Sequence, residues 1–240
     1  MRVALHPCYI LHQRPYRETS LIVDVFSRDY GRIALVARGA KRNRSPQRFV
    51  LQPFRRLNIA WSMRTELGTL AQAEAAGPLP NLSADGLMSA FYVNELLMRL
   101  LHRHESHPDL FESYAAVLAE LPGAGSAEAS LRVFEKRLLV SLGYGLVLDH
   151  DVETGAALGR DQNYFYDVER GPTVKPRNAA RTIQVSGATL GALLNESFVG
   201  ELQLEEAKLL MRVVLAEHLG DKPLSSRELY RKFLLERERA

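Results

Sequence analysis

The first 75 residues alternate short β-forming runs with turn residues, and no apolar pattern of helical period interrupts them. Arg28-Asp29-Tyr30-Gly31 has the composition of a hairpin turn. The odd positions from Phe49 to Trp61 are mostly apolar, as expected of a half-buried strand, and Pro53 limits that strand to an edge or a bulge. Strands are predicted at residues 8–14, 20–27, 31–37, 49–61 and 64–73. Five short strands in so few residues favour a small closed barrel over a sandwich.

The stretch between the third and fourth predicted strands is strongly basic. Residues 38–48 carry five cationic side chains and no acid, and small residues such as Gly39, Ser45 and Pro46 break the strand period. The stretch is therefore predicted to be a loop. An uncompensated positive loop on a strand scaffold suggests contact with a polyanion, most commonly nucleic acid. A solvated linker whose arginines serve only solubility is the alternative.

Charge is divided unevenly along the chain. Residues 1–80 hold 13 Lys and Arg against 5 Asp and Glu, a balance of +8, whereas residues 81–240 hold 18 against 23, a balance of −5. This asymmetry suggests a polyanion-binding module joined to a body with another task. A five-stranded OB-fold barrel, which binds oligonucleotides with one face and its loops, fits the basic segment.

Aromatic side chains matter because a single nucleic-acid strand is usually held by both charge and base stacking. Phe26, Phe49 and Trp61 lie at positions of core parity, so they are interpreted as structural. Tyr16, between two arginines, and Tyr30, in the predicted turn, are the candidates for stacking.

After a turn-rich joint at 77–86 the apolar period becomes helical. Helices are predicted from Leu87 to Leu101, then over 108–121, 127–142 with Ser126 as N-cap, 187–195 with Ser186 as cap, 201–219 and 226–237. Segment 149–182 is polar and irregular, and one β-hairpin is predicted within it at 163–171. The expected organisation is α+β: an OB-fold domain over 1–80 and an all-α helical domain over 81–240, with 149–182 as an insertion.

Several function classes are disfavoured. The single cysteine, Cys8, excludes an intramolecular disulfide and any two- or four-cysteine zinc site, and a structural thiol is favoured over a nucleophile. No Gly-rich phosphate loop, Gly-x-Ser-x-Gly elbow or His-Glu-x-x-His pair is present. Acids in the basic segment are too few for the carboxylate clusters of Mg²⁺ nucleases. We expect a binding protein without catalytic activity, metal or cofactor, and a cytoplasmic one, because no export signal or run of about 20 apolar residues appears.

A set of ordered motifs resembles the bacterial recombination mediator family RecO. The motifs are His12-Gln-Arg-Pro-Tyr-Arg-Glu-Thr-Ser20, Leu21-Ile-Val-Asp-Val-Phe26, Gly31-Arg-Ile-Ala-Leu-Val-Ala-Arg-Gly-Ala40, Leu51-Gln-Pro-Phe54, Tyr92-Val-Asn-Glu-Leu-Leu97, Leu131-Arg-Val-Phe-Glu135, Leu142-Gly-Tyr-Gly145 and Gly220-Asp-Lys-Pro-Leu-Ser-Ser-Arg-Glu-Leu229. The resemblance implies an OB-fold joined to a helical domain. It also implies binding of single- and double-stranded DNA, strand annealing, association with RecR, contact with the C-terminal tail of single-stranded-DNA-binding protein, and help in loading RecA on DNA at the nucleoid. Many members carry a four-cysteine zinc module, which this chain lacks, as in the zinc-free branch of the family.

Two sets of candidate residues follow. The predicted phosphate track is Arg14, Arg17, Arg32, Arg38, Lys41, Arg42, Arg44 and Arg48. The predicted docking site for the acidic tail of single-stranded-DNA-binding protein is Arg132, Lys136 and Arg137, with ordinary surface charges paired with Glu128 and Glu135 as the alternative. A sequence-tolerant RNA-binding barrel and a nuclease or nucleotidyl transferase with a dispersed site are the rival functions.

Overall fold

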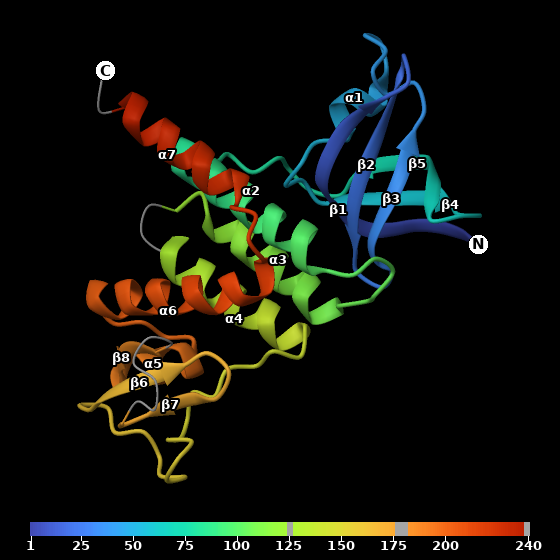
Figure 1. Cartoon of the computed structure of the whole chain (residues 1–240). Coiled ribbons are helices and arrows are strands. Elements are labelled where there is room, and N and C mark those ends of the chain that lie inside the picture. Colours follow the sequence, from blue (N-terminus) through green and yellow to red (C-terminus); the bar gives the residue numbers. More distant parts are fainter. Residues whose placement is uncertain (124–126, 176–181, 238–240) are drawn as a thin grey trace. The chain divides into compact units, whose positions relative to one another are not determined.

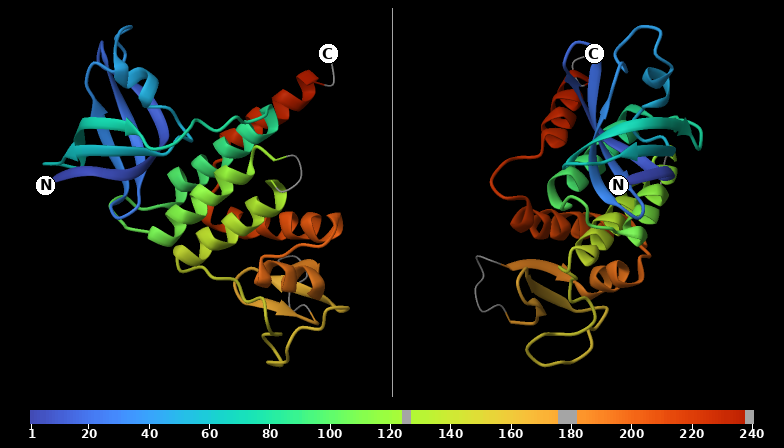
Figure 2. Two further views of the ribbon diagram at one scale, coloured as in Figure 1. Left: turned by 180° about the vertical axis from the view of Figure 1, so that it is seen from behind. Right: turned by 90° about the vertical axis from the view of Figure 1, so that its right-hand side faces the viewer.

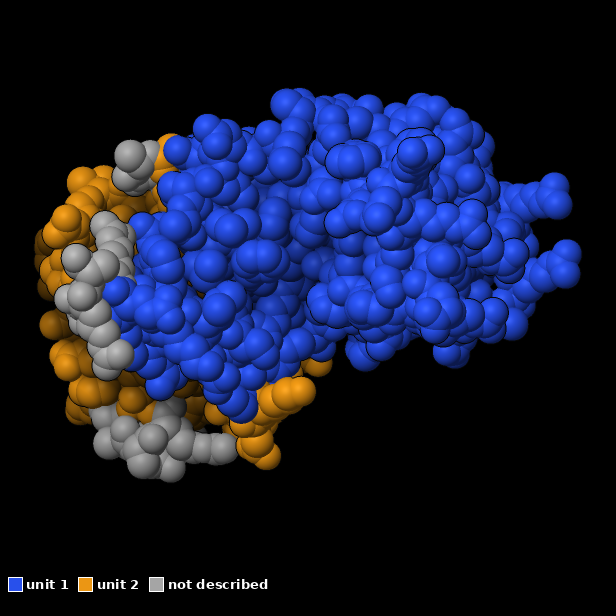
Figure 3. Space-filling model, turned by 90° about the horizontal axis from the view of Figure 1, so that it is seen from above, with its two compact units in different colours: residues 1–122, 223–240 blue, residues 123–222 orange. Residues whose placement is uncertain are grey.

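The computed structural model describes residues 1–123, 127–175 and 182–237. Contacts divide the chain into two compact units (Figure 3). Unit 1 comprises Met1–Pro122 together with Pro223–Ala240, and unit 2 comprises Gly123–Lys222. The predicted division at residue 80 stays a prediction.

Unit 1 begins with a closed five-stranded barrel (Figure 1). Its strands are β1 (Arg2–Tyr16), β2 (Ser20–Ser27), β3 (Gly31–Ala37), β4 (Leu57–Ser62) and β5 (Leu67–Ala75). They pair in the order β1-β2-β3-β5-β4, and β4 closes the barrel on β1. Only the β3–β5 pair is parallel. This is the topology of an OB-fold, so the predicted fold class is confirmed.

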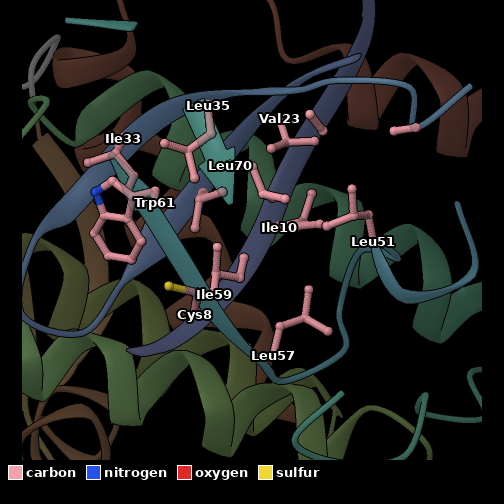
Figure 4. Close-up of a cluster of buried hydrophobic side chains, with 13 residues drawn as sticks. Cys8, Ile10, Val23, Ile33, Leu35, Leu51, Leu57, Ile59, Trp61 and Leu70 are labelled. Atoms are coloured by element: carbon pink, nitrogen blue, oxygen red, sulfur yellow. The ribbon is translucent and has the colours of Figure 1, made fainter. Parts of the chain in front are cut away.

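The interior of the barrel is filled by alternate side chains of all five strands. Cys8 and Ile10 from β1 meet Val23 from β2, Ile59 from β4 and Leu70 from β5, and all of them are buried (Figure 4). Because side chains alternate across a strand, the intervening residues of β1 and β2 point out of the barrel. Several of those outward residues, including Tyr9, Leu11 and Phe26, are also apolar, so they need a second covering layer.

Two helices supply that layer. α2 (Ala84–Leu100) and α3 (Pro108–Glu120) cover the outer face of β1 and β2, where the Phe111 ring lies 5.2 Å from that of Tyr9 and 5.5 Å from that of Phe26. The buried Asn94 side chain donates to the Leu11 carbonyl at 2.8 Å and accepts from the Tyr114 hydroxyl at 2.6 Å. This face of the barrel is therefore occupied by protein, and a ligand must be bound elsewhere.

The β2–β3 end of the barrel is closed as well. Gly31, with φ +64°, packs so tightly that an added Cβ would lie 1.8 Å from the Glu105 carbonyl oxygen. The His104 N–H donates to the Arg32 carbonyl at 3.1 Å, and Arg28 forms an ion pair with Glu112 at 3.3 Å. These contacts fix the barrel to the segment between α2 and α3 and to α3 itself.

The predicted fourth strand is wrong over its first half. Residues Pro46–Val50 form a short helix, α1, and the strand begins only at Leu57. Pro46 in the first turn favours a helix start, and Phe54 adopts φ +66°, which no strand accepts. The predicted core residue Phe49 is consequently 69% exposed. Phe49 and Leu51 are two residues apart at the end of a helix, so their alternating apolar positions did not indicate a strand.

The last helix, α7 (Ser225–Arg237), returns to unit 1 and runs beside α2 (Figures 1 and 2). Its first two N–H groups, from Ser225 and Ser226, donate to the Glu95 carboxylate of α2 at 2.8 Å each. An anion at a helix N-terminus satisfies free amide donors and complements the helix dipole. Glu95 therefore holds α7 on α2.

Unit 2 contains α4 (Ala127–Ser141), α5 (Gly187–Asn195) and α6 (Glu201–Leu219) beside a three-stranded sheet of order β7-β6-β8. The predicted hairpin is present as β6 (Asn163–Asp167) and β7 (Gly171–Thr173), whereas β8 (Thr182–Ser186) was not predicted. Ser186 caps α5 as predicted, since its hydroxyl accepts from the Thr189 N–H. The predicted cap Ser126 lies outside the described residues.

A buried carboxylate organises the irregular segment before β6. Asp151 is 3% exposed and accepts from the N–H groups of Glu153, Thr154 and Val174, each at 2.9 Å. Burial alone would raise the pKa of Asp151, but the three backbone hydrogen bonds outweigh it and hold that pKa below its ordinary value. The segment is thus tied together by one side chain.

We expect Asp151→Ala to lower the free energy of unfolding by about 2–3 kcal/mol at pH 7, because three buried N–H groups lose a charged acceptor. Since the folded pKa is depressed, this stabilisation is fully present above about pH 4 and is lost as the pH falls through the folded pKa. Urea unfolding at pH 7 and pH 3 measures it. The exposed Asp149→Ala is the control, and an equal effect of both substitutions would contradict the role of Asp151.

Candidate nucleic-acid interface

The basic stretch is a loop, as predicted, but it is not free. Ala40 is fully buried, and the Lys41 N–H donates to the Thr19 carbonyl in the β1–β2 turn at 2.9 Å. Gly39, with φ +71°, allows the Arg42 N–H to reach back to its carbonyl at 3.1 Å. Ser45 closes the next turn on the Arg42 carbonyl at 3.0 Å. The cations are therefore carried on a defined chain of turns.

The β1–β2 turn contributes to the same end of the barrel. Arg17 adopts φ +52° at this turn, with its guanidinium carbon 5.2 Å from the centre of the Tyr16 ring. Three residues before Tyr16 on β1, the Gln13 side-chain amide donates to the Leu51 carbonyl at 2.6 Å. Two segments distant in sequence thus meet here. We call this surface the basic end, and its exposed cations are Arg14, Arg17, Arg38, Lys41, Arg42, Arg44 and Arg48.

Arg32 does not belong to the basic end, which corrects the predicted track. It lies six residues before Arg38 on β3, a separation of about 20 Å along a strand. Its half-buried guanidinium donates to the Met98 carbonyl of α2. Burial lowers the pKa of Arg32, nearby Arg103 lowers it further, and Asp24 only partly offsets both. Arg32 serves the junction between barrel and helices.

The aromatic predictions divide in the same way. Phe26 and Trp61 are buried, as predicted. Tyr30, a stacking candidate, instead packs edge-on against Trp61 with ring centres 5.2 Å apart, so its ring closes the barrel core. Tyr16 stays at the basic end beside Arg17. Phe49, interpreted from sequence as core, is the exposed ring of this surface.

The predicted tail-docking cations on α4 are all engaged within unit 2. Arg132 is 6% exposed and forms a 2.6 Å ion pair with Glu135, itself 1% exposed. Lys136 pairs with Glu196 at 2.8 Å and donates to the Leu193 carbonyl at 2.9 Å. Arg137 also binds Glu196, which lies at the C-terminal end of α5.

Docking of the acidic tail at these three cations stays a prediction, but Arg132 and Lys136 are already paired with carboxylates of unit 2. The hydrogen bond from Arg137 lowers the pKa of Glu196, burial opposes it, and Lys136 adds to the lowering. Glu128, the other predicted surface partner, pairs with Lys208 instead. Only the Arg137 side chain, 44% exposed, remains substantially open to solvent.

The described residues contain no group of three or more His, Cys, Asp or Glu side chains arranged to hold a metal ion. Burial raises the pKa of the Cys8 thiol to about 12, with the Ser27 hydroxyl opposing it, so the thiol is protonated and inert at neutral pH. Within the described parts of the chain, no helix has the length and apolarity needed to cross a membrane.

A closed OB-type barrel with seven exposed cations at one end, whose β1–β2 face is covered by helices, is the arrangement expected of a nucleic-acid-binding protein. Family comparison narrows this class. Residues 1–79 match the recombination protein O N-terminal family and residues 83–228 match the recombination protein O C-terminal family. The chain belongs to the RecO family of DNA repair and recombination proteins.

Individual relatives agree over almost the full length. The DNA repair protein RecO of Nitrosococcus oceani is 48% identical over 229 residues, which cover 95% of this chain and 93% of the relative. The RecO protein of Dechloromonas aromatica is 46% identical, covering 96% of each chain, and that of Nitrosospira multiformis is 42% identical, covering 97% of this chain and 96% of the relative.

Proposed function

We propose that the basic end binds DNA phosphates and that the protein mediates recombination without bond chemistry. The exposed cations of two converging segments carry this proposal, because phosphate contacts hold a strand without reading its sequence. Single- and double-stranded DNA are both ligands. Neutralising two strands on one protein lowers their mutual repulsion, which promotes annealing.

The same proposal includes the partners expected of the family. The protein associates with RecR, contacts the C-terminal tail of single-stranded-DNA-binding protein, and helps to load RecA on coated DNA. The chain belongs to a zinc-free branch, since its one cysteine is buried in the barrel and segment 149–182 contains none. Asp151 ties part of that segment together by hydrogen bonds.

Annealing of complementary labelled oligonucleotides tests the function. We expect the full chain to accelerate annealing and to leave strand lengths intact in the presence of Mg²⁺. Shortened or extended strands would favour the nuclease or nucleotidyl transferase instead. Competition with an RNA of the same sequence tests the other rival function, a sequence-tolerant RNA-binding barrel. Preferential binding of RNA would overturn the assignment to DNA.

For the acidic tail we propose docking at Arg137, the most exposed of the α4 cations. A tail carboxylate there competes with Glu196, so Arg137→Ala should weaken binding of a labelled tail peptide about five-fold. Arg212→Ala, an exposed arginine on α6, is the matched control. Fluorescence anisotropy measures both, and equal affinities for wild type and Arg137→Ala would exclude Arg137. Arg132→Ala is compared only after its thermal midpoint has been measured, because Arg132 is buried.

A further inference from the structure

One aromatic ring stands out on the surface of the barrel. Phe49 on α1 is 69% exposed, more than any other aromatic side chain among the residues that the structure describes. Its neighbour Arg48 is exposed, and both lie on α1 in the segment between β3 and β4 that also supplies Lys41, Arg42 and Arg44 to the basic end. A large apolar ring among exposed cations contributes little to stability, because an exposed ring does not gain the free energy of burial.

The exposure follows from a fixed turn. The Leu51 N–H donates to the Gln47 carbonyl at 2.9 Å, and the Gln52 amide donates to the Arg48 carbonyl at 2.8 Å. Leu51 itself is 1% exposed in the barrel core and is anchored through its carbonyl by Gln13. With Leu51 fixed inward, the helical turn directs Phe49 outward. The ring is held at the surface by the backbone on either side of it.

We propose that Phe49 is a stacking platform for an unpaired nucleobase of a DNA strand whose phosphates lie on the basic end. This inference rests on the proposed DNA binding and extends it. Phosphate contacts alone favour single strands and duplexes alike, whereas a ring needs a base whose face is accessible. Phe49 therefore gives the basic end its preference for single strands. The aromatic face accepts any base, so the preference carries no sequence requirement.

Affinity measurements separate stacking from charge. Phe49→Ala should weaken binding of a thymidine oligonucleotide about 5- to 150-fold, the range of a lost base stack, and leave binding of an abasic oligonucleotide of equal length unchanged. The dependence of affinity on salt should keep its slope, because no phosphate contact is removed. Phe49→Tyr should restore binding. Tyr144→Ala, which removes an exposed ring of unit 2, is the matched control and should have no effect.

A direct readout comes from Phe49→Trp. The natural Trp61 is 2% exposed, so it supplies a constant background emission. The thymidine oligonucleotide should quench the added tryptophan, and the abasic one should not. Equal losses of affinity on both oligonucleotides, absence of quenching, or loss of binding to a protein partner with DNA affinity intact would each overturn the proposal. A wrong assignment of DNA binding to the basic end is recognised separately. In that case DNA would still bind, but replacing Arg42 and Arg44 would leave the slope of log affinity against log salt unchanged.

Discussion

Replacing Arg42 and Arg44 together by glutamate is expected to weaken binding of single-stranded DNA at least about 25-fold at 0.1 M salt. Each phosphate contact on a single strand contributes about 0.7 to the slope of log affinity against log salt, which corresponds to about five-fold in affinity at that concentration. If about four cations contact phosphates at once, the slope should change from roughly −3 to roughly −1.5. Repulsion by the new carboxylates adds to the loss.

The control is a pair with the same change of charge on the same barrel. Arg2 and Arg64 are exposed, and the Met63 N–H donates to the Met1 carbonyl beside them, away from the basic end. Arg2→Glu with Arg64→Glu should lower affinity only slightly and leave the slope near that of the wild type. Titrations at four salt concentrations measure both double variants. A slope that is unchanged in the loop variant, or equally reduced in the control, would remove the basic end from the mechanism.

Strands of the barrel could be predicted where the local residue preferences and the turn composition agree with the final fold. The bounds of β2 and β3 were correct because apolar and β-branched runs flank a turn with hairpin composition. The predicted strand 49–61 failed because Phe49 and Leu51 mimic a period of two across one helical turn. Three or four residues cannot distinguish these periods. Ser45 and Pro46 can begin a helix, but both residue types are equally common in loops, so the sequence does not distinguish the two.

For the candidate site, the sequence predicted where positive charge is clustered but not which contacts each cation makes. Clustering of positive charge is a property of sequence, and the exposed cations of the basic stretch are where composition placed them. What a cation contacts is a tertiary property. Arg137 binds Glu196, which is 59 residues away in the sequence, and Arg32 binds the carbonyl of Met98, which is 66 residues away. A local sequence pattern therefore cannot predict either contact. The exposure of Phe49 depends in the same way on where Leu51 is anchored.

Glu135→Ala should lower the free energy of unfolding by about 3–5 kcal/mol, the largest stability effect that we expect in this chain. The substitution leaves the guanidinium of Arg132, which is 6% exposed, without the carboxylate that it contacts at 2.6 Å. Removing one member of a buried ion pair costs far more than the pair itself contributes, because the remaining charge stays desolvated. For a chain of this size the thermal midpoint should fall by roughly 10 °C.

Two further variants identify the cause. Arg132→Met combined with Glu135→Leu removes both charges with similar volume and should recover most of the stability, because no unpaired charge then remains. Glu128→Ala breaks the exposed pair with Lys208 in the same unit and should cost less than about 1 kcal/mol. Urea unfolding at pH 7 compares the four proteins. If the double variant is as unstable as Glu135→Ala, the loss comes from altered packing and not from an unpaired buried charge.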